Sequence, residues 1–374
     1  MLAAAGVITG YIIPFILVLS LLVFVHEMGH YLVGRWSGIR VTAFSIGFGP
    51  ELVGVTDSHG TRWKLSLIPL GGYVKFYGDE DAASRPGTAQ LDGMTAAERS
   101  QTLAGAKLWK RAATVAAGPI ANFLLAIAIF AVLFGVYGRM IADPVVSEVR
   151  PDSAAAEAGL QPGDRLMALD GTKIRTFDDV RRYVSIRPES RIVVTVERDG
   201  REMDIPVVPR RSEITDQFGN KIEMGLIGIV TNEQSGNFRH VTYTPLEAVQ
   251  QGVIETGQII SGTFRYLGNL VTGRMKADQL GGPVRVAQAS GQMATLGIAA
   301  VIQLAAVLSV SIGLLNLMPV PVLDGGHLVF YAIEAVRGKP LGAGAQEVAF
   351  RIGLAMVLSL MVFATWNDIS NLIG

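Results

Sequence analysis

Residues 8–33 are ITGYIIPFILVLSLLVFVHEMGHYLV, and the rest of the chain can be interpreted outward from this stretch. It is longer than the roughly 20 apolar residues that a helix needs to cross a lipid bilayer. It also contains His26-Glu27-Met28-Gly29-His30, an H-E-x-x-H pattern. On a helix, His26 and His30 share one face and can bind one zinc ion, while Glu27 lies beside them as a general base. The stretch therefore predicts a zinc peptidase site near the end of a membrane-spanning helix.

The bare five-residue pattern also occurs by chance on solvated helices, which is the alternative interpretation. Here the residues on both sides of the pattern are apolar. Ionisable side chains are costly inside a membrane and usually have a function where they occur there. The apolar flanks therefore favour a metal site over a chance match.

The composition indicates a membrane protein. Half of the 374 residues are hydrophobic and only 17% are charged, whereas about a quarter are charged in typical soluble domains. Lys+Arg and Asp+Glu balance at 32 each, so no net basic field attracts nucleic acid, which is not an expected partner. Cysteine is absent, so metal ligands must come from His, Asp or Glu. The amino-terminal run lacks the basic start and cleavage site of a signal peptide, and we expect it to be retained.

Three further apolar segments are long enough to cross the membrane. They are about residues 112–138, which Arg111 and Arg139 flank, about residues 294–317, and about residues 348–366. Pro319 and Pro321 stop the helix of the third span, and a short helix is expected to follow over about residues 326–336. In the second span, Asn122 is expected to seek a partner on a neighbouring helix or on the hairpin predicted for residues 64–77, or only to help helices pack.

The segment between the first two spans, residues 36–111, is polar and rich in glycine. Within it, residues 64–77 form two short apolar arms around a Pro-Leu-Gly-Gly sequence, which predicts a β-hairpin because both glycines can adopt positive φ. A hairpin beside a buried site can enter the membrane surface, and an ordinary surface hairpin is the alternative. Its candidate substrate-binding residues are Leu67, Gly71, Gly72 and Tyr73. Residues 79–100 are expected to form a loop.

Residues 139–230 have the composition of a soluble domain, with alternating strands and a turn at Asp199-Gly200. Residues 151–174, PDSAAAEAGLQPGDRLMALDGTKI, resemble a PDZ domain of the bacterial protease type. The resemblance implies that the domain binds chain ends by strand addition, with backbone N–H groups capturing a terminal carboxylate. Gly225, Leu226 and Gly228 resemble the carboxylate loop in a circularly permuted order. A steric gate that binds no peptide is the alternative.

Charges near the spans predict the orientation of the chain. Residues 35–40 and 337–339 each contain two Lys or Arg residues, whereas residues 1–10 and 367–374 contain none. The positive-inside rule then places both basic loops in the cytoplasm and the PDZ-like domain on the other side, with the zinc site toward the cytoplasmic face. After that domain, residues 245–270 predict an amphipathic helix on the membrane surface, so membrane lipid is an expected partner.

Two histidines leave a catalytic zinc site one protein ligand short. Asp324 is the favoured third ligand, because it is one of few acidic residues in the apolar part and follows the helix that Pro319 breaks. His327 is the competing ligand. The other histidines, His59 and His240, lie in polar segments and are expected to be solvated.

Four features together resemble bacterial site-2 proteases, close to the regulator-of-sigma-E protease group, over nearly the whole chain. They are H-E-x-x-H in the first span, GPIANF at residues 118–123, one PDZ-like insert, and NLMPVPVLDGG at residues 316–326. The best-known members of that group carry two PDZ domains in tandem, whereas this chain has room for one. The resemblance places the protein in the bacterial inner membrane.

The expected fold is a multi-pass α-helical membrane protein with four transmembrane helices, a membrane-associated β-hairpin and an inserted mainly-β PDZ-like domain. Its expected segments are residues 1–35, 36–111, 112–138, 139–230, 231–290, 291–336 and 347–370. The resemblance implies an intramembrane protease in which His26, His30 and Asp324 bind Zn²⁺ and Glu27 is the general base. Asn316 would position the substrate backbone or stabilise the oxyanion. The implied substrate is a transmembrane helix already trimmed by another protease, such as an anti-sigma factor or a signal-peptide remnant.

Two other classes of function stay open at this point. One is a metal or ion transporter that uses the embedded His and Asp residues, and the other is a membrane scaffold whose PDZ-like domain works beside an inactive metal site. Glu27 between the histidines and the polypeptide-binding insert both argue against a transporter. Loss of peptide cleavage on Glu27→Gln would separate a protease from both.

Overall fold

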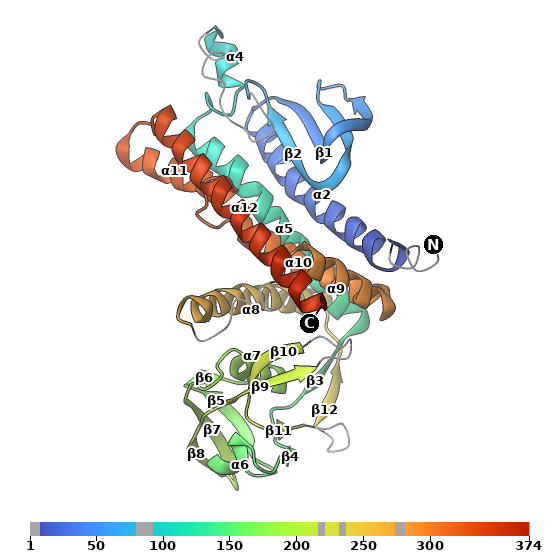
Figure 1. The fold of residues 1–374 in the computed structure, drawn as a ribbon, viewed down its shortest axis with the longest axis vertical. Coiled ribbons are helices and arrows are strands. Elements are labelled where there is room, and N and C mark those ends of the chain that lie inside the picture. The colour runs from blue at the N-terminus through green and yellow to red at the C-terminus, as the bar shows by residue number, and fades with distance from the viewer. Residues whose placement is uncertain (1–7, 80–92, 216–220, 232–236, 274–280, 374) are drawn as a thin grey trace. The chain divides into compact units, whose positions relative to one another are not determined.

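The computed structural model describes residues 8–79, 93–215, 221–231, 237–273 and 281–373. The chain divides into two compact units (Figure 1). The first unit, here called the membrane unit, comprises residues 1–130 and 281–374, and the second, here called the inserted unit, comprises residues 131–280. The loop expected at residues 79–100 lies partly outside the described residues, since residues 80–92 are not described.

Four helices among the described residues are long and apolar enough to cross a membrane. They are α2 (Ile13–Trp36), which a short π-helix η1 (Ile8–Ile12) precedes, α5 (Leu108–Tyr137), α10 (Ile298–Asn316) and α12 (Ala343–Ile373). Together with the antiparallel sheets described below, they confirm the predicted multi-pass helical membrane protein with an added β-rich part. Pro14 lies in the first turn of α2, where its missing N–H costs little.

The third span begins later than expected because a separate helix precedes it. Helix α9 (Pro283–Thr295) ends before Gly297, whose φ of 105° a helix cannot accommodate, and α10 starts at Ile298. Helix α9 packs against α2, α10 and α12. The Asp368 carboxylate of α12 accepts hydrogen bonds from the backbone N–H groups of Gly282 and Arg285, which fixes the start of α9. Helix α11 (Asp324–Arg337) follows the proline-containing break after α10, and the short helix α4 (Ala96–Ser100) lies before α5.

The expected hairpin over residues 64–77 has a different pairing. Strand β2 (Arg62–Phe76) pairs with strand β1 (Val41–Thr56), and Ile46 of β1 pairs with both Gly72 and Leu65. The first part of β1 therefore lies between the two arms that the sequence predicted to pair with each other. A two-residue type I′ turn needs positive φ at both central residues, and of the two glycines only Gly71 has it, with φ 134°.

An aromatic cluster packs this sheet against the last turns of α2. The rings of Phe44 and Trp63 stack with centroids 4.6 Å apart, and Tyr31 of α2 contacts both rings edge-on, at 5.9 Å and 5.0 Å. Tyr31, Phe44, Val74 and Phe76 are all buried. Because Tyr31 directly follows His30, this packing holds β2 beside the H-E-x-x-H turn of the helix.

The inserted unit is rich in short antiparallel strands. Its strands are β3 (Arg139–Ala142), β4 (Glu148–Val149), β5 (Arg165–Leu169), β6 (Thr172–Lys173), β7 (Ile192–Arg198), β8 (Arg201–Val207), β9 (Arg210–Thr215), β10 (Lys221–Leu226), β11 (Ile229–Val230) and β12 (Phe238–Val241). Its helices are α6 (Ala154–Ala158), α7 (Phe177–Ser185) and α8 (Pro245–Val271). The largest sheet has the order β6-β5-β7-β8, and β4 pairs with β11, β9 with β10 and β3 with β12.

The core of this unit follows from alternation in β7. Ile192, Val194 and Val196 are fully buried, and they pack with residues of β5, β8, α6 and α7. The predicted turn at Asp199-Gly200 is confirmed, because φ is 50° and 74° at these two residues and the flanking strands pair. The helix expected at residues 245–270 corresponds to α8, which Thr244 starts with a capping box.

Candidate metal centre

Three ligand-type side chains converge within the membrane unit. His26 and His30 lie on α2, and Asp324 is the first residue of α11. The Nε2 atoms of the two histidines are 3.2 Å apart, and Asp324 Oδ2 lies 3.2 Å from His26 Nε2 and 3.5 Å from His30 Nε2. Among the described residues, these three form the group of His, Asp and Glu side chains that could hold a metal ion.

The spacing of the three atoms fits a tetrahedral zinc ion. With zinc–ligand bonds of about 2.0–2.1 Å, the ligand atoms of a tetrahedral site lie about 3.3–3.4 Å from one another. The observed separations of 3.2, 3.2 and 3.5 Å match that edge length. Two imidazoles and one carboxylate leave one position of the tetrahedron open, as catalytic zinc sites require.

Hydrogen bonds set the orientation of both imidazoles. His30 Nδ1 lies 2.9 Å from the backbone carbonyl oxygen of Thr114 in α5. A carbonyl oxygen only accepts, so Nδ1 carries the proton and Nε2 presents a lone pair to Asp324 and His26. Three electron-rich atoms then face one another at hydrogen-bond distance, an arrangement that a cation stabilises. The carbonyl behind the ring is the kind of outer partner that metal-binding histidines usually have.

Asn122 of α5 holds the second ring. Its side-chain amide lies 3.2 Å from His26 Nδ1, and Asn122 is fully buried. With zinc on Nε2, Nδ1 must donate, so the amide atom facing it is the oxygen, an assignment that the hydrogen-bond network decides. This assignment gives Oδ1 a partner, which it otherwise lacks among the described residues. Asn122 therefore orients His26 as Thr114 orients His30.

Two glycines allow α5 to lie this close to the histidines. A Cβ atom added at Gly118 would overlap the imidazole of His30 and lie 2.9 Å from His26 Cε1. One added at Gly29 would overlap the carbonyl group of Ala117. The contact between α2 and α5 is therefore made of backbone against backbone, as small residues permit in membrane helices.

The chain matches a family model for peptidase family M50 over residues 14–360. The chain belongs to this family. A protein of Agrobacterium fabrum that is named as a zinc metalloprotease is 78% identical to this chain over 373 residues. The alignment covers 100% of this chain and 99% of that protein. A similarly named protein of Brucella suis is 53% identical over 364 residues, covering 97% and 96%. Metalloprotease MmpA of Caulobacter vibrioides is 39% identical over 382 residues, covering 96% and 95%.

In this M50 chain, a cavity of about 330 Å³ opens beside the three ligand-type residues. Glu27, the predicted general base, lines it, and the backbone of Val74 in β2 hydrogen-bonds to the Glu27 carboxylate. Asn316, at the end of α10, also lines the cavity. Of the four residues predicted for substrate binding on the hairpin, Gly72 and Tyr73 line it, whereas Leu67 is 56% exposed and Gly71 faces Phe48.

His327, the competing ligand, lies on α11 and also lines this cavity. Its ring packs against Phe350, with centroids 5.4 Å apart, and against Phe330 at 6.4 Å. It is not part of the group of three residues whose ligand atoms converge. The geometry therefore favours Asp324 as the third ligand.

The three residues predicted for the carboxylate loop lie in the inserted unit. Gly225 and Leu226 end β10, and Gly228 has φ 85°. The carbonyl oxygen of Gly228 accepts from Arg150 N–H at 2.8 Å, and a Cβ at Gly228 would overlap Ser153. The loop is thus tightly built, and its role in peptide binding stays a prediction.

Sequence reasoning did not identify two contributors to the metal centre. Asn122 was predicted to find a partner, but His26 was not singled out as that partner. The carbonyl of Thr114 gave no signal at all, because every residue has one. The signal that could have found Asn122 is its position four residues after Gly118, on the same face of α5.

Proposed function

We propose that this chain is a zinc-dependent intramembrane protease that hydrolyses a peptide bond within the transmembrane segment of a single-span protein. The observation that carries the proposal is the spacing of the ligand atoms of His26, His30 and Asp324, which matches the edge length of a zinc tetrahedron. Both histidines lie on α2, a helix apolar enough to span a membrane. Bound there, zinc would lower the pKa of water and polarise the scissile carbonyl group.

The chain's own residues supply the rest of the chemistry. The Glu27 carboxylate accepts the proton of the attacking water and returns a proton to the leaving amine nitrogen. Its position beside both histidines suits that role. The Asn316 amide donates a hydrogen bond to the substrate backbone or to the oxygen that becomes negative as the carbonyl is attacked.

Strand β2 offers a way to hold the substrate. A transmembrane helix hides its peptide bonds in its own hydrogen bonds, so the cleaved part must be unwound first. Residues 72–76 pair with β1, and Val74 lies beside Glu27. An unwound substrate strand that adds along this segment would pass the cavity at Gly72 and Tyr73.

The charge pattern supports an orientation in the bacterial inner membrane. The basic loops that follow the first span and precede the last would lie in the cytoplasm, and the PDZ-like domain outside. That domain would bind chain ends left by an earlier cleavage or restrict access to the site. Anti-sigma factors and signal-peptide remnants are substrates of this kind. Deleting residues 145–230 should widen substrate choice if the domain is a gate, and an inactive but folded deletion would contradict the gate.

The deciding assay incubates purified protein with a single-span substrate and repeats the reaction with Glu27→Gln. We expect cleavage to be lost while zinc content is retained, because Glu27 is not a ligand. Cleavage that survives this substitution would overturn the mechanism. Zinc analysis separates the ligands: Asp324→Asn should lose the metal, and His327→Ala should keep it.

A further inference from the structure

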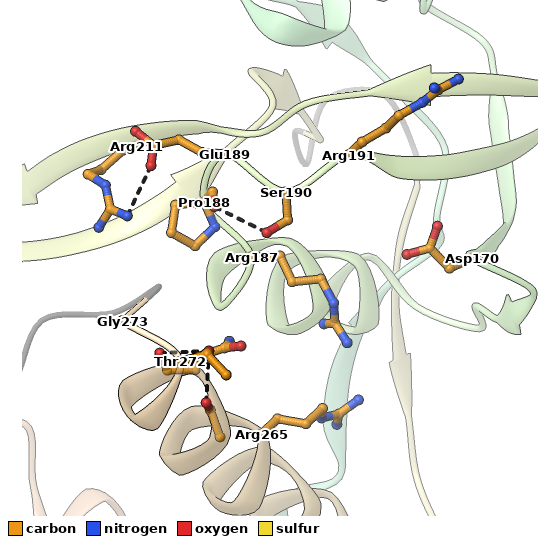
Figure 2. A pocket seen from close by; sticks show the side chains of 12 residues that line it. Asp170, Arg187, Pro188, Glu189, Ser190, Arg191, Arg211, Arg265, Thr272 and Gly273 are labelled. Carbon is orange, nitrogen blue, oxygen red and sulfur yellow. Dashed lines mark hydrogen bonds and ion pairs between the residues drawn. The ribbon is translucent and has the colours of Figure 1, made fainter.

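The inserted unit contains a second, larger cavity that the proposed protease chemistry does not use. Its volume is about 950 Å³ (Figure 2). One wall is the loop after α7, residues 187–191, and the opposite wall is the last part of α8, from Arg265 to Gly273. Asp170 and Arg211 of β9 complete the lining.

This cavity has a surplus of positive charge. Four arginines line it, Arg187, Arg191, Arg211 and Arg265, against two carboxylates, Asp170 and Glu189. Glu189 is engaged with Arg211, at 3.1 Å. Asp170 already accepts from Tyr183 Oη at 2.8 Å and from Val193 N–H at 2.7 Å. Both carboxylates are therefore committed within the unit.

Three of the arginines form no ion pair in the described part of the chain. Arg187 donates to the carbonyl oxygen of Tyr183 at 2.8 Å and lies over that ring, 3.6 Å from its centroid. Arg265 donates only to Ser261 of its own helix. Burial lowers the pKa of the Arg187 guanidinium, and the charge of Arg265 lowers it further, which means that the two cations repel each other. An anion between them would remove that repulsion.

The character of α8 indicates where such an anion comes from. Exposed apolar side chains recur along one side of the helix, namely Leu246, Val249, Val253, Phe264 and Val271. Successive members of this set are three, four, eleven and seven residues apart, which keeps them on one helical face. This pattern is typical of a helix that lies in the membrane interface. Phe264 and Val271 directly neighbour the cavity residues Arg265 and Thr272 in sequence. Lipid chains on the apolar side would thus place their headgroups near the cavity.

We propose that this cavity binds the phosphate-bearing headgroup of an anionic phospholipid, with Arg187 and Arg265 as hydrogen-bond donors. Arginine suits this role because its planar guanidinium binds phosphate through two parallel N–H groups. A headgroup held between Arg187 and Arg265 joins the loop after α7 to α8. The lipid thereby fixes how the β-rich part of the inserted unit is held against its amphipathic helix.

The test measures binding of short-chain phosphatidylglycerol to the purified full-length protein in neutral detergent by titration calorimetry. Wild-type protein should bind it, and should bind phosphatidylcholine of the same chain length much more weakly. Arg265→Gln and Arg187→Gln should each weaken binding about fivefold, since one arginine near an anionic lipid contributes about 1 kcal/mol. Arg201→Gln, an exposed arginine of β8 outside the cavity, should leave binding unchanged.

Other outcomes would overturn the proposal. Equal affinity for phosphatidylcholine, or no effect of Arg265→Gln in a protein that keeps its zinc and its thermal transition, would exclude a headgroup site here. Inorganic phosphate that binds as tightly as the lipid would show a site for the free ion instead. An acidic peptide that displaces the lipid at lower concentration would make the cavity a peptide site. All these readouts are independent of protease activity.

Discussion

Gly118 is the residue on which the geometry of the metal centre depends most directly. Any side chain there must displace the imidazole of His30 or push α5 away from α2. We expect Gly118→Ala to lower zinc affinity and peptidase activity about 10–100-fold, as loss of outer-shell support typically does. Zinc content after dialysis against a graded chelator measures the effect. Gly135→Ala in the same helix is the control, because its Cβ would meet only Ala248 at an ordinary 3.6 Å. Equal zinc affinity in both variants would contradict the steric argument.

A second prediction at the residue scale concerns whether the oxygen or the nitrogen of the Asn122 side-chain amide faces His26 Nδ1. If the amide oxygen accepts from Nδ1–H, Asn122→Leu should weaken zinc binding about 10–100-fold. Asn122→Asp should retain most of the affinity, because a carboxylate also accepts and carboxylate–histidine–zinc arrangements are common. The comparison of the two variants by zinc titration is the measurement. A worse loss in Asn122→Asp than in Asn122→Leu would mean that the amide nitrogen faces the ring.

The sequence predicted the three side chains that converge at the candidate metal centre better than the groups that orient them. His26 and His30 follow from helical spacing, and Asp324 from the proline break that precedes it. These are local patterns or rare residue types in an apolar context. The partner of Asn122 depends on which faces of α2 and α5 meet, and no spacing within either helix states that. A backbone carbonyl such as that of Thr114 cannot be singled out from sequence.

At the scale of elements, the β1–β2 sheet shows where local signals fail. The arms of β2 have the alternation and central glycines of a hairpin, yet β1 separates them. Residues 41–56 of β1 were interpreted only as part of a polar, glycine-rich loop, because Gly47, Gly49 and Pro50 interrupt their pattern. In the structure, Gly47 and Gly49 have φ of 90° and 88°, so the glycines bend the strand rather than end it.

Gly72 is the point at which this sheet meets α2. A Cβ atom there would lie 2.6 Å from the Ser45 carbonyl oxygen, 2.7 Å from a methyl carbon of Val23 and 3.2 Å from Glu27 Cγ. Gly72→Ala should therefore move β2 or Glu27 by a fraction of an ångström. We expect a loss in kcat approaching 100-fold, since small displacements of reacting groups are costly. Zinc content should stay at the wild-type level, because Gly72 contacts no ligand.

Kinetics on a single-span substrate, with metal analysis of the same sample, check the prediction for Gly72. A variant that loses zinc and activity together would show that β2 supports the metal centre itself. Unchanged kinetics would show that the sheet is free to move away from α2.

At the scale of the whole molecule, the chain switches from apolar to soluble composition and back, and this switch predicted an inserted part. The structure assigns α8 to that part, whereas the sequence treated residues 231–290 as a connecting region. Ion pairs join α8 to the rest of the inserted unit. Glu255 of α8 lies 3.0 Å from Arg139 and 2.8 Å from Arg182 of α7, residues at least 73 positions away in the chain. Pairs so distant in sequence leave no local pattern.

The inserted unit should respond to acid through one buried ion pair. Asp164 is 1% exposed, and both of its oxygens accept from Arg198, at 2.6 and 2.7 Å. Burial alone would raise the pKa of Asp164, but the hydrogen bonds from Arg198 and from the Gln161 N–H outweigh it, so the pKa lies below its ordinary value. A carboxyl group with a lowered folded pKa stabilises the fold above its unfolded pKa of about 3.9 and loses that contribution as pH falls through the folded value.

Asp164→Asn should therefore destabilise the inserted unit at pH 7 by about 3 kcal/mol, the low end of the cost of breaking a buried ion pair, because Arg198 is 21% exposed and keeps its hydrogen bond to the Gly159 carbonyl oxygen. The difference between variant and wild type should start to shrink as the pH falls below about 4, where Asp164 becomes protonated in the unfolded chain, and should vanish once the pH passes the lowered pKa of Asp164 in the folded protein. Hydrogen exchange of the β5 and β7 amides in the full-length protein measures this local stability. Asp199→Asn, which removes the same charge at the exposed β7–β8 turn, is the matched control and should exchange like wild type. A pH-independent gap between Asp164→Asn and wild type would place the stabilising contribution in packing rather than in the ion pair.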